Sequence, residues 1–254
     1  MSGFYALIAR YYDSEHDDKT EDFEFYREVA DDTDGPILIV GAGTGRILLN
    51  LAEMGHEVHG IEQENAMLER AAQHRDAAPK DIQQRVRSIR GDALTVDLEQ
   101  QYRMVAIPYN TLMHFHSQEA HLGLLRRCRE WLVPGGVLAI DLPNAADAYA
   151  AQYTGAVVLE RTFLDQETGH LVMQHSVSEL DRTQQLMHVT WIYDEVTGDH
   201  TVKRTVAPVI NRFFFYSEMR LLLEKAGFGS IEVYGDLDYS DYIDGCPRMV
   251  IVAK

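Results

Sequence analysis

The chain has 254 residues, of which 46% are hydrophobic and 25% are charged, so it can form one large globular domain or one domain with a sizeable insertion. Its formal net charge is −17, and it lacks the clustered lysines and arginines with which nucleic-acid-binding proteins neutralise phosphates. These values argue against a nucleic-acid partner and favour a small molecule.

The two cysteines, Cys128 and Cys246, are too few and too far apart to form a disulfide framework. No apolar run approaches the roughly 20 residues of a membrane-spanning helix, and the N-terminus has no basic and apolar leader. We therefore expect a cytoplasmic protein that binds no membrane. The sequence is compatible with a homodimer but does not fix an oligomeric state.

The N-terminal third predicts two helices and then a buried strand. Apolar residues at helical spacing predict helices over 4–13 and 22–32, joined by an acidic loop. The uninterrupted run "ILIV" at 37–40 is typical of a strand that is covered on both faces. A glycine-rich turn follows that strand directly.

The next hundred residues alternate between helical and strand patterns. Helices are predicted at 46–55, 64–75 and 117–132, the last with Ser117 as its N-cap, and strands at 57–62, 85–92, 102–108 and 137–143. This alternation predicts βαβ units, and therefore a doubly wound parallel sheet of the α/β class.

The pattern changes after Pro143. Strands are predicted at 156–165, 170–180, 186–196 and 200–215, separated by short turns, which indicates an inserted antiparallel β layer. A helix at 217–228 and strands at 229–235 and 247–254 complete the chain. We therefore expect an N-terminal helical cap (1–34), a Rossmann-like domain (35–148 and 216–254) and a β insertion (149–215) that covers the substrate site. The pattern does not fix which insertion side chains, such as Trp191 and Tyr193, face that site.

The turn "VGAGTGR" nearly matches the dinucleotide-binding pattern G-x-G-x-x-G. Its glycines are Gly41, Gly43 and Gly45, and Arg46 stands where that pattern needs a third small residue. A large side chain there would obstruct the approach of a pyrophosphate. The spacing therefore favours a ligand whose polar tail, without pyrophosphate, rests against the turn.

Two acidic residues at strand ends suggest the rest of that ligand. Glu62 ends the strand at 57–62, where its carboxylate could accept hydrogen bonds from both ribose hydroxyls, although an isolated glutamate there is often only solvated. Asp92 follows the next strand and could accept a hydrogen bond from an adenine amino group. Together they indicate an adenosine with an unphosphorylated ribose.

The segments "ILIVGAGTGR", "GHEVHGIEQENAML", "IRGDALTV", "VAIPYNTLMHF" and "LVPGGVLAIDL" resemble the successive motifs of class I S-adenosylmethionine-dependent methyltransferases. The resemblance covers about residues 36–142 and the terminal strand pair. It implies an enzyme with a seven-stranded sheet whose last strand is antiparallel, with S-adenosyl-L-methionine as cofactor and S-adenosyl-L-homocysteine as product. It also implies a cofactor site made of Tyr12, Gly41, Ala42, Gly43, Gly45, Arg46, Glu62, Gln63, Met67, Asp92, Ala93 and Pro108.

One position departs from this family. The strand before the turn usually carries an acid two residues before the first glycine, and that acid helps to hold the cofactor's ammonium group. This chain has Ile39 there. Asp13 and Glu15 are the candidate replacements, and weak cofactor binding is the alternative.

The N-terminus "ALIARYYDSEH" and the strand insertion are similar to those of small-molecule N-methyltransferases, including amino-sugar and glycine N-methyltransferases. That resemblance implies a catalytic His114 near the methyl acceptor, with a pKa suited to proton removal near neutrality. Tyr12 is the second catalytic candidate because a phenol can contact the sulfonium, whereas Tyr11 would pack inward.

Three alternatives remain at this point. The acceptor atom could be oxygen instead of nitrogen, or the chain could bind the cofactor without transferring a methyl group. A nicotinamide-dependent oxidoreductase is disfavoured by Arg46 and by the lack of a Tyr-x-x-x-Lys pair. His114, His116 and His121 could form a zinc site, but no further ligand completes the set, so no metal is expected.

Overall fold

The computed structural model describes residues 3–145, 155–199 and 201–254. The predicted boundary at 148/149 and the predicted strand residue 200 lie outside these ranges. The helices are α1 (Phe4–Glu15), α2 (Glu21–Asp31), α3 (Arg46–Glu53), α4 (Asn65–Ala77), α5 (Lys80–Gln83), the 3-10 helix η1 (Thr111–His114), α6 (Gln118–Trp131) and α8 (Tyr216–Ala226). The strands are β1 (Ile37–Val40), β2 (Val58–Glu62), β3 (Val86–Arg90), β4 (Tyr102–Ile107), β5 (Leu132–Pro143), β6 (Val158–Leu164), β7 (Leu171–Asp181), β8 (Leu186–Val196), β9 (Val202–Arg212), β10 (Ile231–Tyr234) and β11 (Arg248–Ala253).

Seven strands form the central sheet in the order β10-β11-β5-β4-β1-β2-β3. The pairs among β5, β4, β1, β2 and β3 are parallel, whereas β11 is antiparallel to both of its neighbours, β5 and β10. The predicted doubly wound α/β sheet with a reversed last strand is therefore confirmed.

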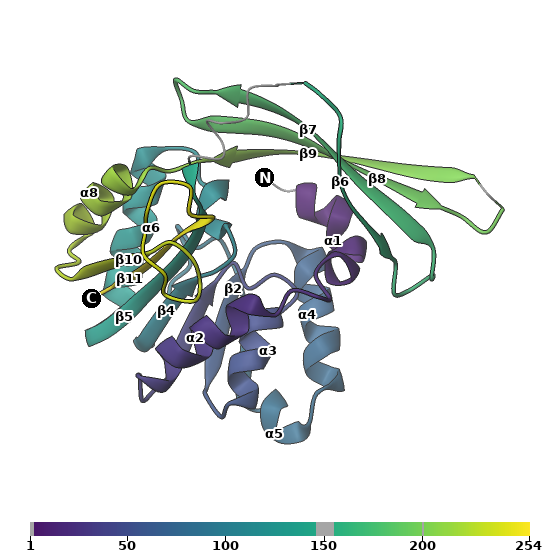
Figure 1. Cartoon of the computed structure of the whole chain (residues 1–254). Coiled ribbons are helices and arrows are strands. Elements are labelled where there is room, and N and C mark those ends of the chain that lie inside the picture. The colour runs from purple at the N-terminus through teal and green to yellow at the C-terminus, as the bar shows by residue number, and fades with distance from the viewer. Residues whose placement is uncertain (1–2, 146–154, 200) are drawn as a thin grey trace.

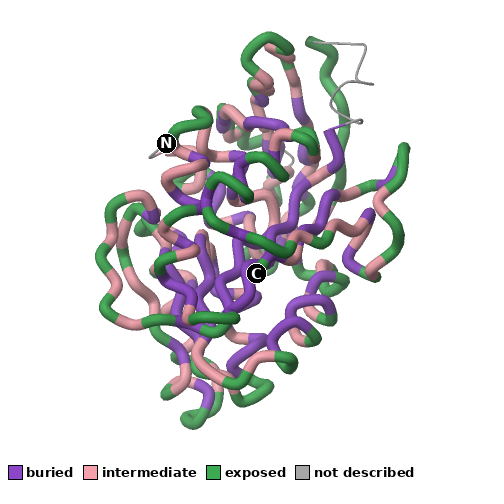
Figure 2. Tube along the Cα trace, turned by 90° about the vertical axis from the view of Figure 1, so that its left-hand side faces the viewer, coloured by how far each residue is buried: buried purple, intermediate pink, exposed green. Residues whose placement is uncertain are grey.

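The apolar run of β1 is buried on both faces, as its sequence predicts. Leu38 and Val40 join the core on the side of α6 and α8, and Ile37 and Ile39 join the core on the side of α2 and α3. Figure 1 shows helices on both sides of the sheet, and Figure 2 shows buried segments in the interior and exposed segments at the periphery. The carboxyl end of β1 is thus held rigidly where the glycine turn begins.

The insertion forms a second, antiparallel sheet in the order β6-β7-β8-β9, which confirms the predicted β layer. One face of this sheet packs on α1, where Ile8 and Tyr11 contact Val172, Tyr193 and Ala207. Figure 1 shows α1 between the inserted sheet and α4. The N-terminal helix therefore connects the insertion to the central domain.

The structure differs from the predicted elements in small ways. Helix α1 continues to Glu15, into the stretch expected to be a loop, and the short helices α5 and η1 were not predicted. Ser117 caps α6 as predicted, because its Oγ accepts a hydrogen bond from the Ala120 N–H at 3.1 Å. Among the described residues, no helix combines the length and the apolar character needed to cross a membrane.

Candidate functional site

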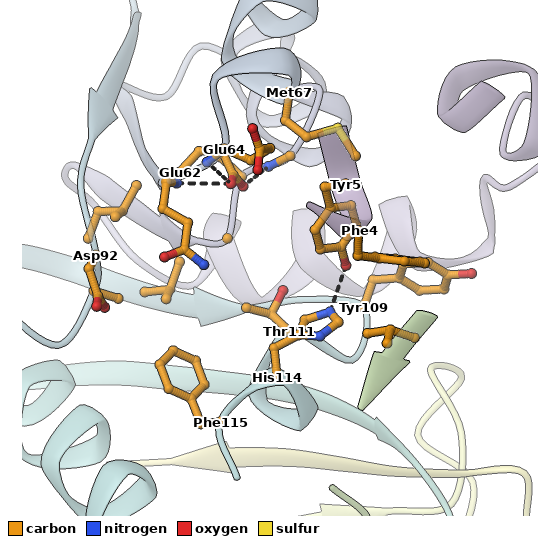
Figure 3. Close-up of a pocket in the computed structure, with 18 of the residues that line it drawn as sticks. Phe4, Tyr5, Glu62, Glu64, Met67, Asp92, Tyr109, Thr111, His114 and Phe115 are labelled. Atoms are coloured by element: carbon orange, nitrogen blue, oxygen red, sulfur yellow. Dashed lines mark hydrogen bonds between the residues drawn. The ribbon is translucent and has the colours of Figure 1, made fainter. Parts of the chain in front are cut away.

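A cavity of about 1000 Å³ lies at the carboxyl ends of β1, β2, β3 and β4 (Figure 3). Helix α1 forms one wall, and the segments 188–190 of β8 and 208–210 of β9 cover it. Parallel α/β sheets bind ligands at this edge, where loops from several strands meet. The cavity brings together twelve of the predicted site residues: Tyr12, Gly41, Ala42, Gly43, Arg46, Glu62, Gln63, Met67, Asp92, Ala93, Pro108 and His114.

The glycine turn has a backbone that only glycine adopts easily. Gly41, Gly43 and Gly45 have φ values of 72°, 57° and 88°, all in the left-handed region. A Cβ atom on Gly41 would collide with the side chain of Thr111, whereas one on Gly43 would meet no atom within 4 Å. The backbone at Gly43 is therefore open for a ligand to approach.

Gly45 is the predicted site residue that does not line the cavity. It precedes α3, and a Cβ there would lie 3.5 Å from the Cβ of Ala71 in α4. Its role in this structure is close packing between the turn and α4 rather than ligand contact.

Arg46 lines the cavity, but its guanidinium group already has partners. The two terminal nitrogens donate to the two oxygens of the buried Asp22 carboxylate, at 2.7 and 2.5 Å, and one also donates to the Lys19 carbonyl at 3.0 Å. This fork-shaped ion pair ties the glycine turn to the start of α2. Burial by itself lowers the pKa of Arg46, but the hydrogen bonds and the charge of Asp22 outweigh it, so the pKa is raised and the residue stays charged.

Glu62 is held at the end of β2 by backbone N–H groups. One carboxylate oxygen accepts from the Gly43 N–H, and the other accepts from the N–H groups of Gln63 and Glu64, all at 2.9 Å (Figure 3). Burial nevertheless raises the pKa of Glu62. Oε1 accepts two of these bonds and Oε2 accepts one, so Oε2 keeps a lone pair that can accept a hydrogen bond from a ribose hydroxyl.

The neighbouring wall suits a flat apolar ring. Met67 and Ala93 are buried there, and Gln63 stands at the rim. Asp92 turns the chain after β3, with one oxygen accepting from the Leu94 N–H at 2.9 Å, and its side chain stays exposed. The Asp92 carboxylate therefore lies beside an apolar wall, and the adenine site stays a prediction.

Tyr5 and His114 meet at the other end of the cavity, although 109 residues separate them. The Tyr5 hydroxyl lies 2.6 Å from His114 Nε2, and the rings pack edge to face (Figure 3). Burial, together with nearby His116, lowers the pKa of His114 to about 4. The expectation that this histidine titrates near neutrality is therefore wrong, because a desolvated imidazolium is unfavourable.

The loop after β4 contains two consecutive strained residues. Tyr109 and Asn110 have φ values of 44° and 66°, which non-glycine residues rarely adopt. Arg248 of β11 holds the loop: it donates to the Asn110 side-chain oxygen at 3.0 Å and forms an ion pair with the buried Asp141. Tyr109 and Thr111 consequently line the cavity.

Neither candidate replacement for the missing acid at position 39 lies in the cavity. Ile39 is itself buried and lines the cavity wall. Asp13 pairs with Arg70 at 3.0 Å and with His74 at 3.3 Å, while Glu15 accepts hydrogen bonds from Gln174 and Tyr193. The expectation that one of them faces the cofactor's ammonium group is not met in this structure.

The two tyrosines of α1 divide as predicted. Tyr12 lines the cavity and stacks on His16, with ring centroids 4.3 Å apart. Tyr11 is buried and stacks on Tyr193 of the inserted sheet, 5.0 Å away. Tyr193 and the partly buried Trp191 thus face α1 rather than the cavity.

The three nearby histidines do not converge on a common point. His114 contacts Tyr5, His116 Nε2 lies 2.8 Å from the Ile210 carbonyl, and His121 Nε2 contacts the Phe115 carbonyl. Within the part of the chain that the structure describes, no three His, Cys, Asp or Glu residues gather as metal ligands.

Tyr5, Tyr109, Thr111 and Arg248 were not among the predicted site residues. Tyr109 and Thr111 lie in the same segment as His114, the predicted catalytic residue, so their position was a usable signal. Tyr5 and Arg248 carried no such signal because only tertiary contacts bring them to the site.

Known proteins that resemble this chain include methyltransferases and a synthase named for a related cofactor. Residues 37–136 match a family model described as a methyltransferase domain. The chain is 34% identical over 104 residues to a carboxy-S-adenosyl-L-methionine synthase of Pseudomonas aeruginosa (strain UCBPP-PA14), a match that covers 40% of this chain and 41% of the synthase. The chain thus spans about two fifths of the length of that curated relative.

Solved structures match nearly the whole chain. The CcbJ methyltransferase from Streptomyces caelestis has a TM-score of 0.78 and 23% identity, covering 95% of each chain. The sugar N-methyltransferase KedS8 from Streptoalloteichus sp ATCC 53650 has a TM-score of 0.74 and 20% identity, covering 100% of this chain and 93% of that one. The match to a methyltransferase domain therefore lies in residues 37–136, and the chain that contains them has the class I methyltransferase fold.

Proposed function

We propose that this protein transfers the methyl group of S-adenosylmethionine to a nitrogen atom of a small molecule. The observation that carries the proposal is the composition of the cavity. One end holds a carboxylate fixed by three backbone N–H groups beside a glycine turn, and the other end holds the Tyr5–His114 pair. These ends correspond to an adenosine site and an acceptor site.

The cofactor end fits an adenosine with a free ribose. Glu62 would accept from a ribose hydroxyl, Asp92 would accept from the adenine amino group, and Met67 would contact the adenine ring. The open backbone at Gly43 would face the amino-acid tail.

The acceptor end favours nitrogen over oxygen. S-adenosylmethionine supplies an electrophilic methyl group, and an uncharged amine attacks it with its own lone pair, whereas a hydroxyl must also lose its proton to a base. A histidine with a pKa of about 4 is a weak base, and the described carboxylates of the cavity, Glu62, Glu64 and Asp92, lie at the cofactor end. The protein would therefore accelerate methyl transfer mainly by positioning the acceptor and excluding water.

The inserted sheet and α1 would provide that exclusion. Arg10 of α1 forms ion pairs with Asp165 after β6, at 2.5 Å, and with Glu195 of β8, at 2.8 Å. Arg70 of α4 pairs with Asp13 of α1 and with Glu167, at 3.0 and 2.8 Å. We propose that these contacts keep α1 and the inserted sheet closed over the reacting groups.

A second candidate function is binding of the cofactor without methyl transfer. It is supported by Ile39, which stands where related enzymes carry an acid that helps to hold the cofactor's ammonium group. Titration calorimetry with S-adenosylmethionine, S-adenosylhomocysteine and NAD separates the candidates. We expect both sulfur ligands to bind and NAD to show no heat of binding. Failure of both sulfur ligands to bind would overturn the proposed function, and binding without turnover on amine or hydroxyl compounds would favour the second candidate.

A further inference from the structure

The acceptor end of the cavity is walled by uncharged side chains. Phe4 and Tyr5 of α1 pack edge to face, with ring centroids 4.9 Å apart, and Tyr5 in turn contacts the ring of His114 (Figure 3). From the inserted sheet, Val189 of β8 and Val209 of β9 are directly paired, and both are buried and line the cavity. An aromatic and aliphatic wall of this kind contacts the apolar groups of a ligand and offers no charge to an anion.

The described part of the cavity lining contains one lysine or arginine, which is Arg46. Its guanidinium group already forms the forked ion pair with Asp22, beside the glycine turn at the cofactor end. The residues outside the described ranges are MS at 1–2, ADAYAAQYT at 146–154 and His200, and they contain no lysine or arginine. A carboxylate or phosphate at the acceptor end would therefore find no lysine or arginine side chain to pair with.

Two further cations lie near Tyr109, but both already have partners. The Lys19 Nζ lies over the Tyr109 ring, 4.4 Å from its centroid, and pairs with Glu21 at 2.6 Å. Arg248 forms its ion pair with the buried Asp141. Neither cation lines the cavity.

Helix α6 does not offer an open anion site either. Its N-terminal end reaches the cavity at Ala120, but the Ser117 Oγ already accepts the Ala120 N–H, and Glu119 adds negative charge to the first turn. An imidazole carries little charge above pH 7, so the histidines of the cavity supply no fixed positive charge there.

The remaining charged residues of the described lining are acids. They are Glu62, Glu64 and Asp92, and the whole chain has a net charge of −17. A field of this sign repels anions from the cavity and attracts cations. An anionic group that entered would also lose its hydration without gaining a partner, which is unfavourable.

We infer that the methyl acceptor is an apolar amine that carries no carboxylate or phosphate group. This inference rests on the proposed function, because it names the class of amine that the same cavity takes. The amine nitrogen would lie beside Tyr5 and His114, and the rest of the molecule would lie against Phe4, Val189 and Val209. Free amino acids and sugars attached to a phosphate group are excluded as acceptors.

The test uses pairs of compounds that differ by one carboxylate: tyramine and tyrosine, phenethylamine and phenylalanine, and tryptamine and tryptophan. Titration calorimetry at about pH 8 measures their binding to the wild-type protein saturated with S-adenosylhomocysteine, at a pH where imidazoles are mostly uncharged. We expect each amine to bind at least about tenfold more tightly than its amino acid, because the carboxylate would be buried unpaired. Tyrosine methyl ester, which has the size of tyrosine without its negative charge, is the control and should bind like tyramine.

Three results would overturn the inference. They are equal binding of the two members of each pair, tighter binding of the amino acids, and no detectable binding of any of the three amines.

A positive charge placed at the acceptor end should reverse the preference. Val209→Lys should raise the affinity for tyrosine relative to tyramine at least about tenfold, because the new ammonium group can pair with the carboxylate. The matched control is Val206→Lys in the same strand, where the wild-type valine is 48% exposed and the alternation of side chains places it on the opposite face. This control should keep the wild-type preference.

Far-UV circular dichroism checks the fold of both variants. A folded Val209→Lys variant that keeps the wild-type preference would overturn the inference. If that variant does not fold, the wild-type pairs decide alone.

Transfer of an isotope-labelled methyl group separates this inference from the proposed function. Labelled product from the amino acids but not from the amines would overturn the inference and support the proposed function. Preferential binding of the amines without labelled product from any compound would support the ligand class and overturn the proposed transfer.

Discussion

At the scale of single residues, the proposed recognition of a ribose depends on Glu62. Its carboxylate is already fixed by three backbone N–H groups, and the free lone pair of Oε2 can accept from one ribose hydroxyl without rearrangement. Preorganisation of this kind reduces the cost of binding. Glu62 was recognised from its place at a strand end, but its partners at Gly43 and Glu64 required the structure.

Glu62→Gln should weaken S-adenosylmethionine binding about 10- to 100-fold, because hydrogen bonds to a charged group contribute roughly 1.5–3 kcal/mol each. Titration calorimetry measures the change. Glu53→Gln is the control, since Glu53 is an exposed residue of α3. Equal affinities for the Glu62 variant and the wild type would remove Glu62 from the ribose site.

His114 should make the protein less stable as the pH falls from about 6.5 to about 4.5. Its folded pKa of about 4 lies below the unfolded value of 6.5, so the unfolded chain binds more protons in this window and gains relative stability. The slope approaches about 1.4 kcal/mol per pH unit for one such group. Urea unfolding of wild type and His114→Gln at pH 7 and at about pH 5 measures it.

The His114→Gln variant should lose less stability than the wild type between these two pH values. Other groups titrate in both proteins, and the comparison cancels their contribution. Equal losses would show that His114 does not carry a lowered pKa in the folded protein.

At the scale of elements, β11 reaches the active-site loop through Arg248. Asp141 is fully buried and forms its ion pair with Arg248, which also holds the strained Asn110. Arg248→Met should reduce the free energy of unfolding by about 3–5 kcal/mol, because it leaves a buried carboxylate without its partner. It should also lower turnover, since Tyr109 and Thr111 lose their support.

A double-mutant cycle in urea unfolding measures this coupling. Adding Asp141→Asn to Arg248→Met removes the unpaired charge and should restore part of the lost stability. If the losses of the two single variants simply add, Asp141 and Arg248 are not coupled as the structure indicates.

Elements were predictable where their pattern is local. The apolar run Ile37–Val40 and the alternation that follows it specified the central sheet, and short turns specified the four inserted strands. The end of α1 was missed because the acidic residues after Asp13 read as a loop, whereas Ser14 is buried and Glu15 bonds to the inserted sheet. Tertiary contacts therefore extend this helix beyond its sequence pattern.

At the scale of the whole molecule, the site depends on contacts between distant parts of the chain. The sequence places Glu62 and Asp92 at the ends of successive strands, so their position at the carboxyl edge of the sheet, in the proposed adenosine site, was predictable. The Tyr5–His114 contact and the Arg248 support join segments more than 100 residues apart, and no local pattern encodes them. The acceptor end was for this reason predicted only in part.

The central claim is that this cavity transfers a methyl group to nitrogen. The direct test is mass spectrometry after incubation with S-adenosylmethionine that carries an isotope-labelled methyl group, together with matched panels of small amines and hydroxyl compounds. We predict labelled N-methyl products with an equal amount of S-adenosylhomocysteine, both strongly reduced in Glu62→Ala. A label found on oxygen, or tight cofactor binding with no labelled product from any compound, would contradict the account.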